Sequence, residues 1–435
     1  VTEKNALCPP RHVPYLPAYT PFRPGCLWRG TRQTIKYFCC QGSPIHETLL
    51  RCLSQVSLAS VLETGEVVAL KRIHIRNTSG IPDVIVREIK ALQSVSHPNV
   101  VALLDVFPKG QAIYLVQEYC TTDLAALLRR LPAPPPERIA KGLMLQMCRG
   151  LEALHAEGIM HRDIKPSNTL LSASSGTLKL ADCGLARPHD GGERPAYTHA
   201  VATRWYRAPE LLYGARCYGP AVDTWALGLV WAELLGLSPL VPGDNDIDQL
   251  GRVIATFGSM EAVWPVVCEL PDWGKIAFPA AQAVPLGRLL PGASGAALDF
   301  LAQFLRYDPS QRITASDAVR SAYLTSQHPP PADEAEIAQW LAATLEAAEA
   351  ATAAARRAAA ATGGGAARGG GGAGQQQQQQ QQYQQEQSHV QQQAGPQQGG
   401  LMHGGCCDQQ ELWWGAQWRQ PKAPLAACWE SLPLI

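Results

Sequence analysis

The chain has 435 residues, enough for a two-lobed domain of about 270 residues and further segments. Its 37 basic and 37 acidic residues cancel, so the charge indicates neither a nucleic-acid partner nor binding to a membrane surface. Apolar runs stay below the length of about 18 residues that a membrane span needs, and a secretory signal pattern is missing. The 13 cysteines lack zinc-ligand spacing, which favours reduced thiols in the cytoplasm or nucleus.

The first part of the chain is predicted to contain strands around one helix. Residues 1–58 are rich in proline and cysteine and show no clear period. A hairpin turn is expected at 63–66, followed by strands at 67–71, 100–106 and 113–116. Apolar residues from Val84 to Leu92 recur at helical spacing, and His97-Pro98-Asn99 breaks that helix.

The following part is predicted to be mainly helical. Helices are expected at 125–130, at 137–157 after a proline-rich link, and over much of 223–324, with a short strand at 178–180. Strands first and helices second is the order of an α+β fold.

The composition changes after residue 326. Residues 332–361 are rich in Ala and Glu and favour a solvent-exposed helix. The glycine run at 363–374 and the glutamine run at 375–382 hold too little apolar surface to fold, so we expect a disordered tail. The tryptophans near the end indicate either a docking segment or a spurious translated extension, and these two alternatives stay open. They are Trp413, Trp414, Trp418 and Trp429.

A polar stretch reads His-Arg-Asp-Ile-Lys-Pro-Ser-Asn at 161–168, and Asp-Cys-Gly follows at 182–184. Phosphoryl transfer from ATP needs an acceptor for the proton of the attacking hydroxyl, a cation near the moving phosphate and oxygen ligands for Mg²⁺. Asp163 can serve as the acceptor and Lys165 as the cation. Asn168 and Asp182 can offer oxygens to the metal. The alternative is a charged turn beside a buried strand, but the stretch resembles the catalytic loop of serine/threonine protein kinases.

Two further residues fit the same chemistry. Lys71 ends a Val-Ala-Leu-Lys strand, where a lysine can pair with the α- and β-phosphates of ATP. Glu88 follows 17 residues later in the predicted helix and can hold that lysine. Lys71 alone could be an ordinary lysine at a strand edge, and Glu88 makes this alternative weaker.

The stretch at 197–210, Tyr-Thr-His-Ala-Val-Ala-Thr-Arg-Trp-Tyr-Arg-Ala-Pro-Glu, resembles the activation segment of the cyclin-dependent and MAP-type kinases. The resemblance implies that Thr198 receives an activating phosphate. A phosphothreonine attracts arginines, and Arg87, Arg162 and Arg187 stand at matching positions. Any one of these arginines alone could be a surface charge.

The same resemblance assigns other residues. Thr203 would hydrogen-bond Asp163 and Lys165. Asp223 would brace the catalytic loop, and Glu210 would form a buried, structural ion pair with Arg312. Arg207 with Val201 and Ala202 matches the site that favours proline after the phosphorylated residue, so we expect substrates with Ser-Pro or Thr-Pro sites.

The resemblance covers residues 59–325, and it is close at 211–216, 238–243, 245–250 and 263–265. These stretches resemble the cell cycle-related branch of the cyclin-dependent kinase family. The resemblance implies a two-lobed protein kinase fold, with a small strand-rich lobe at 59–120 and a larger helical lobe at 121–325. It implies a serine/threonine protein kinase that uses ATP and Mg²⁺, acting in the cell cycle or in length control of cilia and flagella. The cilium therefore joins the cytoplasm and nucleus as an expected location.

The resemblance also implies a nucleotide site. Glu118 and Cys120 would supply backbone hydrogen bonds to adenine, Ala69 and Leu170 would sandwich its ring, and Gln117 would limit access behind it. The remaining expected nucleotide contacts are Val56 and Asp123.

The chain departs from the family pattern in its first segment. The glycine-rich loop that covers the ATP phosphates should lie at 49–54, but Leu-Leu-Arg-Cys-Leu-Ser stands there. We interpret 1–58 as a wrong first exon or the effect of a fragment. The alternative is an altered nucleotide site, which would favour a kinase-shaped binding protein that transfers phosphate poorly.

Two other departures concern regulation. Cys183 replaces the usual Phe and should pack less well beneath the regulatory helix. The segment 81–88 departs from the form found in the main cell-cycle kinases. The sequence therefore leaves open whether a cyclin or cyclin-like protein activates this chain.

Overall fold

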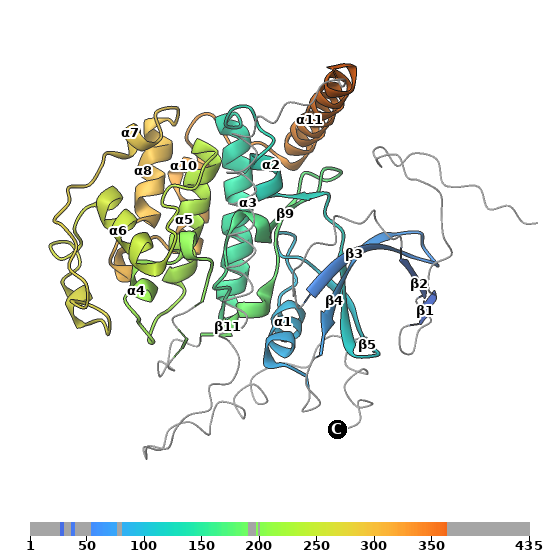
Figure 1. The fold of residues 1–435 in the computed structure, drawn as a ribbon, viewed down its shortest axis with the longest axis horizontal. Helices are drawn as coiled ribbons and strands as arrows, with labels where there is room; N and C mark the ends of the chain where they lie inside the picture. The colour runs from blue at the N-terminus through green and yellow to red at the C-terminus, as the bar shows by residue number, and fades with distance from the viewer. Residues whose placement is uncertain are drawn as a thin grey trace, which may run out of the picture.

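The computed structural model describes residues 27–29, 36–39, 54–75, 81–189, 197–198 and 201–362. Within these residues, the main sheet and helix α1 lie at one end and most of the other helices at the other, with the long helix α3 (Glu137–Ala156) between them (Figure 1). Several predicted features lie outside the described residues. They are positions 49–53 of the expected phosphate loop, residues 199–200 of the activation segment, and the glycine-, glutamine- and tryptophan-rich tail.

The strand-rich lobe contains a six-stranded antiparallel sheet of order β1-β2-β3-β4-β6-β5. Its strands are β1 (Leu27–Arg29), β2 (Lys36–Cys39), β3 (Ser54–Val61), β4 (Val67–His74), β5 (Leu103–Lys109) and β6 (Ala112–Glu118). Gly65, at φ +73°, makes the predicted turn between β3 and β4. The strands β1 and β2 and the start of β3 lie within residues 1–58, where the sequence showed no clear period, so these strands were not predicted. Such short strands carry too few residues for a recognisable alternation.

Helix α1 (Asp83–Ser94) buries Ile85, Ile89 and Leu92, the apolar face that the helical spacing predicted. The strand predicted from residue 100 begins three residues later, at Leu103. The reason is a competing contact. Val101 N–H donates to the Leu180 carbonyl (2.9 Å), so this backbone bonds the helical lobe instead of the sheet.

The helical lobe contains α2 (Leu124–Leu128), α4 (Pro209–Leu212), α5 (Ala221–Gly236), α6 (Asp246–Phe257), α7 (Leu286–Leu289), α8 (Gly295–Phe304), α9 (Ala315–Arg320) and α10 (Ala322–Thr325). Its short strands are β7 (Thr122–Asp123), β8 (Ile159–Met160), β9 (Thr169–Leu171), β10 (Leu178–Leu180) and β11 (Arg187–Pro188). Single 3-10 turns are η1 (Pro166–Asn168), η2 (Cys183–Leu185), η3 (Arg204–Tyr206), η4 (Pro265–Glu269) and η5 (Pro309–Gln311).

Helix α5 forms the centre of this lobe, because it is apolar on all sides and almost fully buried. Trp225 and Trp231 of α5 are both completely buried. The expected ion pair is present, with Arg312 Nη1 and Nη2 at 2.6 and 2.7 Å from the Glu210 carboxylate. It joins η5 to α4 inside the lobe.

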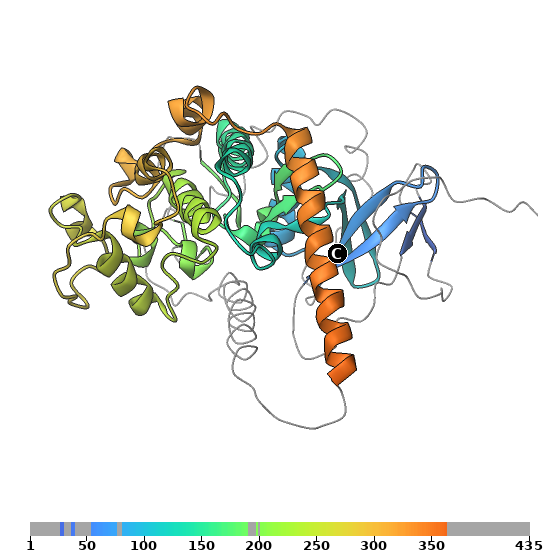
Figure 2. The same ribbon diagram turned by 90° about the horizontal axis from the view of Figure 1, so that it is seen from above.

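Helix α11 (Glu334–Thr362) covers the helix predicted at 332–361. Its first turns are not solvent-exposed, because Ile337 and Leu341 are fully buried. The later turns are largely exposed, and the far end of the helix extends beyond the other elements (Figure 2). None of the described helices combines the length and the apolar character of a membrane span.

Candidate active site

Lys71 joins the two lobes through two carboxylates. Its Nζ lies 2.7 Å from Glu88 Oε1 on α1 and 2.9 Å from Asp182 Oδ1, just after β10. Burial alone would lower the pKa of Lys71, but Asp182 and Glu88 outweigh burial and raise it. In turn, the Lys71 ammonium holds the pKa of Asp182 well below its usual range. The site thus presents a charged ammonium and an ionised carboxylate.

Asp163 is surrounded by donors that orient its carboxylate. The Thr203 N–H and hydroxyl both donate to Oδ1, at 3.1 and 3.0 Å. Lys165 Nζ lies 2.7 Å from Oδ2 and donates to the Thr203 hydroxyl at 3.0 Å. Asn168 Nδ2 donates to Oδ2 at 2.9 Å. The carboxylate of Asp163 is therefore fixed between three side chains, one of them 40 residues away.

The backbone of the catalytic loop is held by a buried carboxylate on α5. Asp223 accepts from His161 N–H at 2.8 Å and from Arg162 N–H at 2.7 Å, and it lies 2.9 Å from His155 Nε2. Arg162 has φ +65°, a left-handed conformation that costs energy in a non-glycine residue. These bonds stabilise it. The role of His155 was not predicted, since a lone histidine near a helix end carries no signal.

Asn168 and Asp182 stand at the two ends of the β9–β10 hairpin, where Ala181 N–H donates to the Asn168 carbonyl at 2.9 Å. Asn168 uses its amide nitrogen for Asp163, so its oxygen is the atom that it can offer. The Asp182 side chain is 40% exposed. One amide oxygen and one carboxylate suit Mg²⁺, which takes its other ligands from water and phosphate groups. The residues present therefore fit the expected metal.

The expected adenine-facing residues lie on neighbouring strands. Val56 of β3 pairs with Lys71 of β4, and Ala69 of β4 pairs with Gln117 of β6. Val56 is 63% exposed, whereas Gln117 is buried. Gln117 Nε2 has no hydrogen-bond partner among the described residues, so this buried amide has a donor to spare.

The end of β6 and the segment after it contain three of the residues expected at the nucleotide site, Glu118, Cys120 and Asp123. Glu118 N–H donates to the Ala102 carbonyl (3.2 Å), so only its carbonyl could bond adenine. Burial raises the pKa of the Cys120 thiol to about 11. Asp123 caps α2 through a hydrogen bond from Ala126 N–H (2.8 Å) and pairs with Leu170 across β7 and β9.

Three arginines gather near Thr198. Burial, followed by the positive charges of Arg87 and Arg162, lowers the pKa of Arg187 to about 10. Arg162 Nη1 donates to the Tyr218 hydroxyl at 2.7 Å, and that hydroxyl donates to the Thr198 carbonyl at 2.6 Å. Tyr218 was not predicted, because it lies 56 residues from Arg162 and belongs to no local pattern. The cluster is an arrangement of cations that an added anion would stabilise.

Arg207 turns two backbone carbonyls inward. Its Nε donates to the Val201 carbonyl at 2.9 Å and its Nη2 to the Ala202 carbonyl at 3.1 Å. Ala202 has φ +64°, so its backbone is left-handed. Asp246, which was not among the predicted site residues, lies 3.0 Å from Arg207 Nη1.

Cys183 is fully buried in η2, and η2 contacts α1. Burial raises the pKa of this thiol above its usual range, so the group stays neutral.

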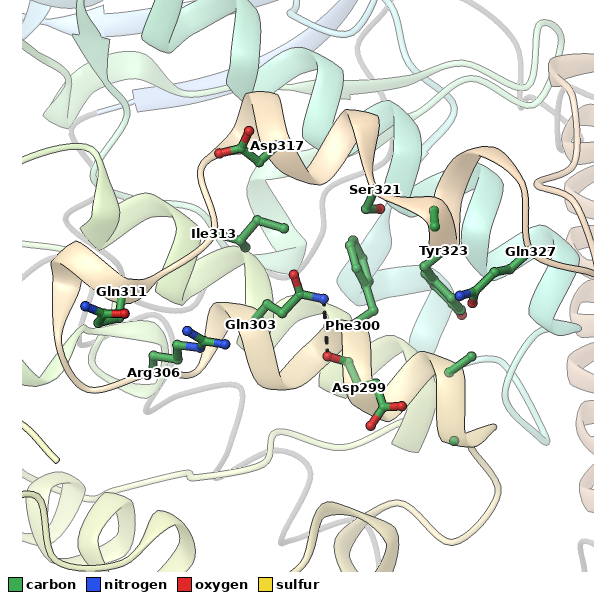
Figure 3. A pocket seen from close by; sticks show the side chains of 13 residues that line it. Asp299, Phe300, Gln303, Arg306, Gln311, Ile313, Asp317, Ser321, Tyr323 and Gln327 are labelled. Atoms are coloured by element: carbon green, nitrogen blue, oxygen red, sulfur yellow. Dashed lines mark hydrogen bonds between the residues drawn. The ribbon is translucent and has the colours of Figure 1, made fainter.

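A cavity of about 660 Å³ lies elsewhere, between α8 and the α9–α10 segment (Figure 3). Phe300, Gln303 and Ser321 are among its lining residues, which include none of the predicted site residues. The cavity is therefore separate from the candidate active site.

Comparison with known proteins agrees with this geometry. Residues 52–324 match the protein kinase domain family. Cyclin-dependent kinase 20 of Rattus norvegicus is 49% identical over 284 residues, covering 64% of this chain and 81% of the relative. Its counterpart in Homo sapiens is 46% identical over 282 residues, with the same coverage of 64% and 81%.

A second kinase, cyclin-dependent kinase 7 of Xenopus laevis, is 42% identical over 272 residues, covering 61% of this chain and 76% of the relative. The family match spans more than half of the chain, and the fold divides into a strand-rich and a helical part as that family requires. The chain therefore belongs to the protein kinase family and, within it, to the cyclin-dependent-kinase-like serine/threonine kinases.

Proposed function

We propose that this chain transfers the γ-phosphate of ATP to serine or threonine residues that precede proline in protein substrates. The observation that supports this most is the set of hydrogen bonds around Asp163. Thr203 and Lys165 hold its carboxylate in one orientation, as a residue that accepts the proton of a substrate hydroxyl requires. Lys165 would stand close enough to the same hydroxyl to neutralise charge on the moving phosphate.

Lys71, Asn168 and Asp182 would bind the nucleotide and its metal. Lys71 would contact the phosphates while Glu88 keeps it in place, and Mg²⁺ would be held by Asn168 and Asp182. Bound Mg²⁺ would neutralise phosphate charge during transfer. Ala69, Gln117, Glu118, Cys120 and Leu170 would surround adenine, with Val56 and Asp123 at the edges.

The proposed preference for proline follows from the hydrogen bonds that Arg207 donates to the Val201 and Ala202 carbonyls. Because Arg207 occupies the Val201 and Ala202 carbonyls, a substrate N–H placed there would lose its hydrogen bond, which costs about 1–3 kcal/mol. Proline has no N–H and avoids this cost.

The relatives are named cyclin-dependent kinases, which supports a cyclin or cyclin-like activator as a partner. Helix α1 is the candidate contact, because it carries both Glu88 and Arg87. Co-purification of the chain with cyclins, compared with a variant carrying Val84→Asp on the partly exposed part of α1, tests this partner.

The activity is tested on the full chain with Thr198 phosphorylated, using Mg-ATP and two peptides that differ only in Pro or Ala after the serine. We expect the Ser-Pro peptide to react at least about tenfold faster, and Asp163→Asn to lower kcat by about 10²–10⁴-fold. Asp299→Asn, at an exposed aspartate of α8, is the matched control and should keep the wild-type rate.

Equal rates on both peptides would disprove the proline preference. If the wild type and Asp163→Asn were equally inactive, the chain would be a kinase-shaped binding protein. The buried Cys183 beneath α1 is the described feature that favours this second candidate.

A further inference from the structure

The segment that follows α10 folds back on α3, outside the residues that match the kinase domain family. Residues 327–345, named here the C-terminal clamp, include the first turns of α11. Ala332 is buried, and Ile337 and Leu341 are fully buried. Helix α11 contacts α3 directly. Figures 1 and 2 both show the first turns of α11 close to α3.

Polar groups on α3 match the clamp. Arg138 donates to both carboxylate oxygens of Glu336, at 3.1 and 2.6 Å. The Lys141 side chain is completely buried, and its ammonium donates to the carbonyls of Gln327 and Pro329 at 3.2 and 2.8 Å. A buried ammonium needs such partners, so without the clamp Lys141 would lose two acceptors.

Two glycines let the clamp backbone approach closely. A Cβ at Gly142 of α3 would stand 2.5 Å from the Ala332 carbonyl oxygen and 2.8 Å from Ile337 Cδ1. A Cβ at Gly176 would collide with the Glu334 carbonyl oxygen and stand 2.8 Å from Ala338 N. Because real side chains do not tolerate such distances, both contacts depend on glycine.

Gly176 connects this contact to the candidate metal ligands. It lies in the turn between β9 and β10, and Gln146 of α3 donates to its carbonyl at 3.0 Å. Asn168 directly precedes β9, and Asp182 follows β10 by two residues. A hydrogen bond from Ala181 N–H to the Asn168 carbonyl (2.9 Å) joins the two ends of the hairpin.

We propose that the C-terminal clamp positions Asn168 and Asp182 for Mg-nucleotide by holding the β9–β10 turn against α3. This proposal rests on the proposed function, because it assigns the clamp to the same metal site. Groups behind metal ligands commonly alter metal affinity by orienting those ligands. The clamp would orient Asn168 and Asp182 indirectly, through the β9–β10 hairpin that carries them at its two ends.

The test measures Mg²⁺-dependent binding of a fluorescent ATP analogue to the full chain, a readout that needs no phosphoryl transfer. We expect Ile337→Asp and Glu336→Arg each to raise the Mg²⁺ concentration for half-maximal binding about tenfold. Ala350→Asp, at an exposed position farther along α11, is the matched control and should behave as the wild type. The double variant Arg138→Glu/Glu336→Arg should restore wild-type Mg²⁺ dependence by re-forming the ion pair with opposite polarity.

Two outcomes would overturn the proposal. Unchanged Mg²⁺ dependence in Ile337→Asp and Glu336→Arg, with a lower melting temperature, would make the clamp a stabilising element only. Failure of the double variant to restore the dependence would show that the ion pair does not act through the metal ligands. A chain that shows these Mg²⁺ shifts but no phosphoryl transfer would disprove the proposed activity and keep the clamp.

Discussion

A single hydroxyl group connects the two charged residues that the proposed reaction uses. Thr203 donates to Asp163 and accepts from Lys165, both at 3.0 Å. All three residues are buried, so water competes little for these bonds and each one has a fixed geometry. Small displacements of a catalytic group are costly, because the reacting atoms must be aligned.

Replacement of Thr203 tests this connection. We expect Thr203→Ala to lower kcat by about 10²-fold, because the Asp163 carboxylate loses a donor and its orientation. Thr203→Ser keeps the hydroxyl and should recover most of the rate. Steady-state kinetics with a Ser-Pro peptide would measure both. A serine variant as slow as the alanine variant would show that the methyl group, not the hydroxyl, matters.

At the scale of elements, η3 and α5 are joined by a buried pair. The Tyr206 hydroxyl donates to Glu233 Oε2 at 2.6 Å. Burial raises the pKa of Glu233 from 4.5 to about 7, against the opposing effects of Tyr206 and Arg129. The segment that begins at Thr203 is thus anchored to the centre of the helical lobe by a carboxyl group that titrates near neutrality.

This anchor predicts a pH dependence of stability. Between 4.5 and about 7, the folded protein keeps a proton that the unfolded chain has lost, so stability falls as the pH rises. We expect Glu233→Gln to remove this loss and to gain roughly 3 kcal/mol on the wild type between about pH 4.5 and pH 8, because the pKa is raised from 4.5 to about 7. Urea unfolding at several pH values would measure it, with the exposed Glu349→Gln as control. A difference between Glu233→Gln and wild type that stays constant with pH would contradict the prediction.

At the scale of the whole molecule, the arginine cluster joins both lobes. Arg87 comes from α1, Arg162 from the catalytic loop and Arg187 from β11, and the three carry like charges. Arg87 is paired with Asp83 at 3.4 Å. A phosphate on Thr198 would add acceptors for these donors and connect the lobes through charge.

We expect phosphorylation of Thr198 to stabilise the fold at low salt, by about 1.5–3 kcal/mol for each hydrogen bond that the phosphate accepts from an arginine. Arg187→Gln should reduce this gain, whereas Arg288→Gln, at an exposed position on α7, should not. Thermal unfolding of phosphorylated and unphosphorylated protein would measure the gain, with mass spectrometry to confirm the phosphate. An equal gain in Arg187→Gln and wild type would place the phosphate elsewhere.

The order of strands before helices predicts an α+β fold, and the resemblance to protein kinases implies its two lobes and supports Lys71, Glu88, Asp163 and Lys165 as candidates. Phosphoryl transfer requires particular residue types at short spacings, and such spacings are visible in the chain. The long helices were also predictable, since Ile85, Ile89 and Leu92 repeat at helical spacing.

Tertiary structure decided the contacts between distant residues. Tyr218 reaches Arg162, His155 reaches Asp223, and Arg138 reaches Glu336 across 56, 68 and 198 residues. No local pattern encodes these pairs, because they form only when separate elements pack. The same holds for β1 and β2, which become part of the sheet by pairing, and for α11, whose amphipathic signal is weak. Its first turns are buried because Gly142 and Gly176 leave room for them, a fact of packing and not of composition.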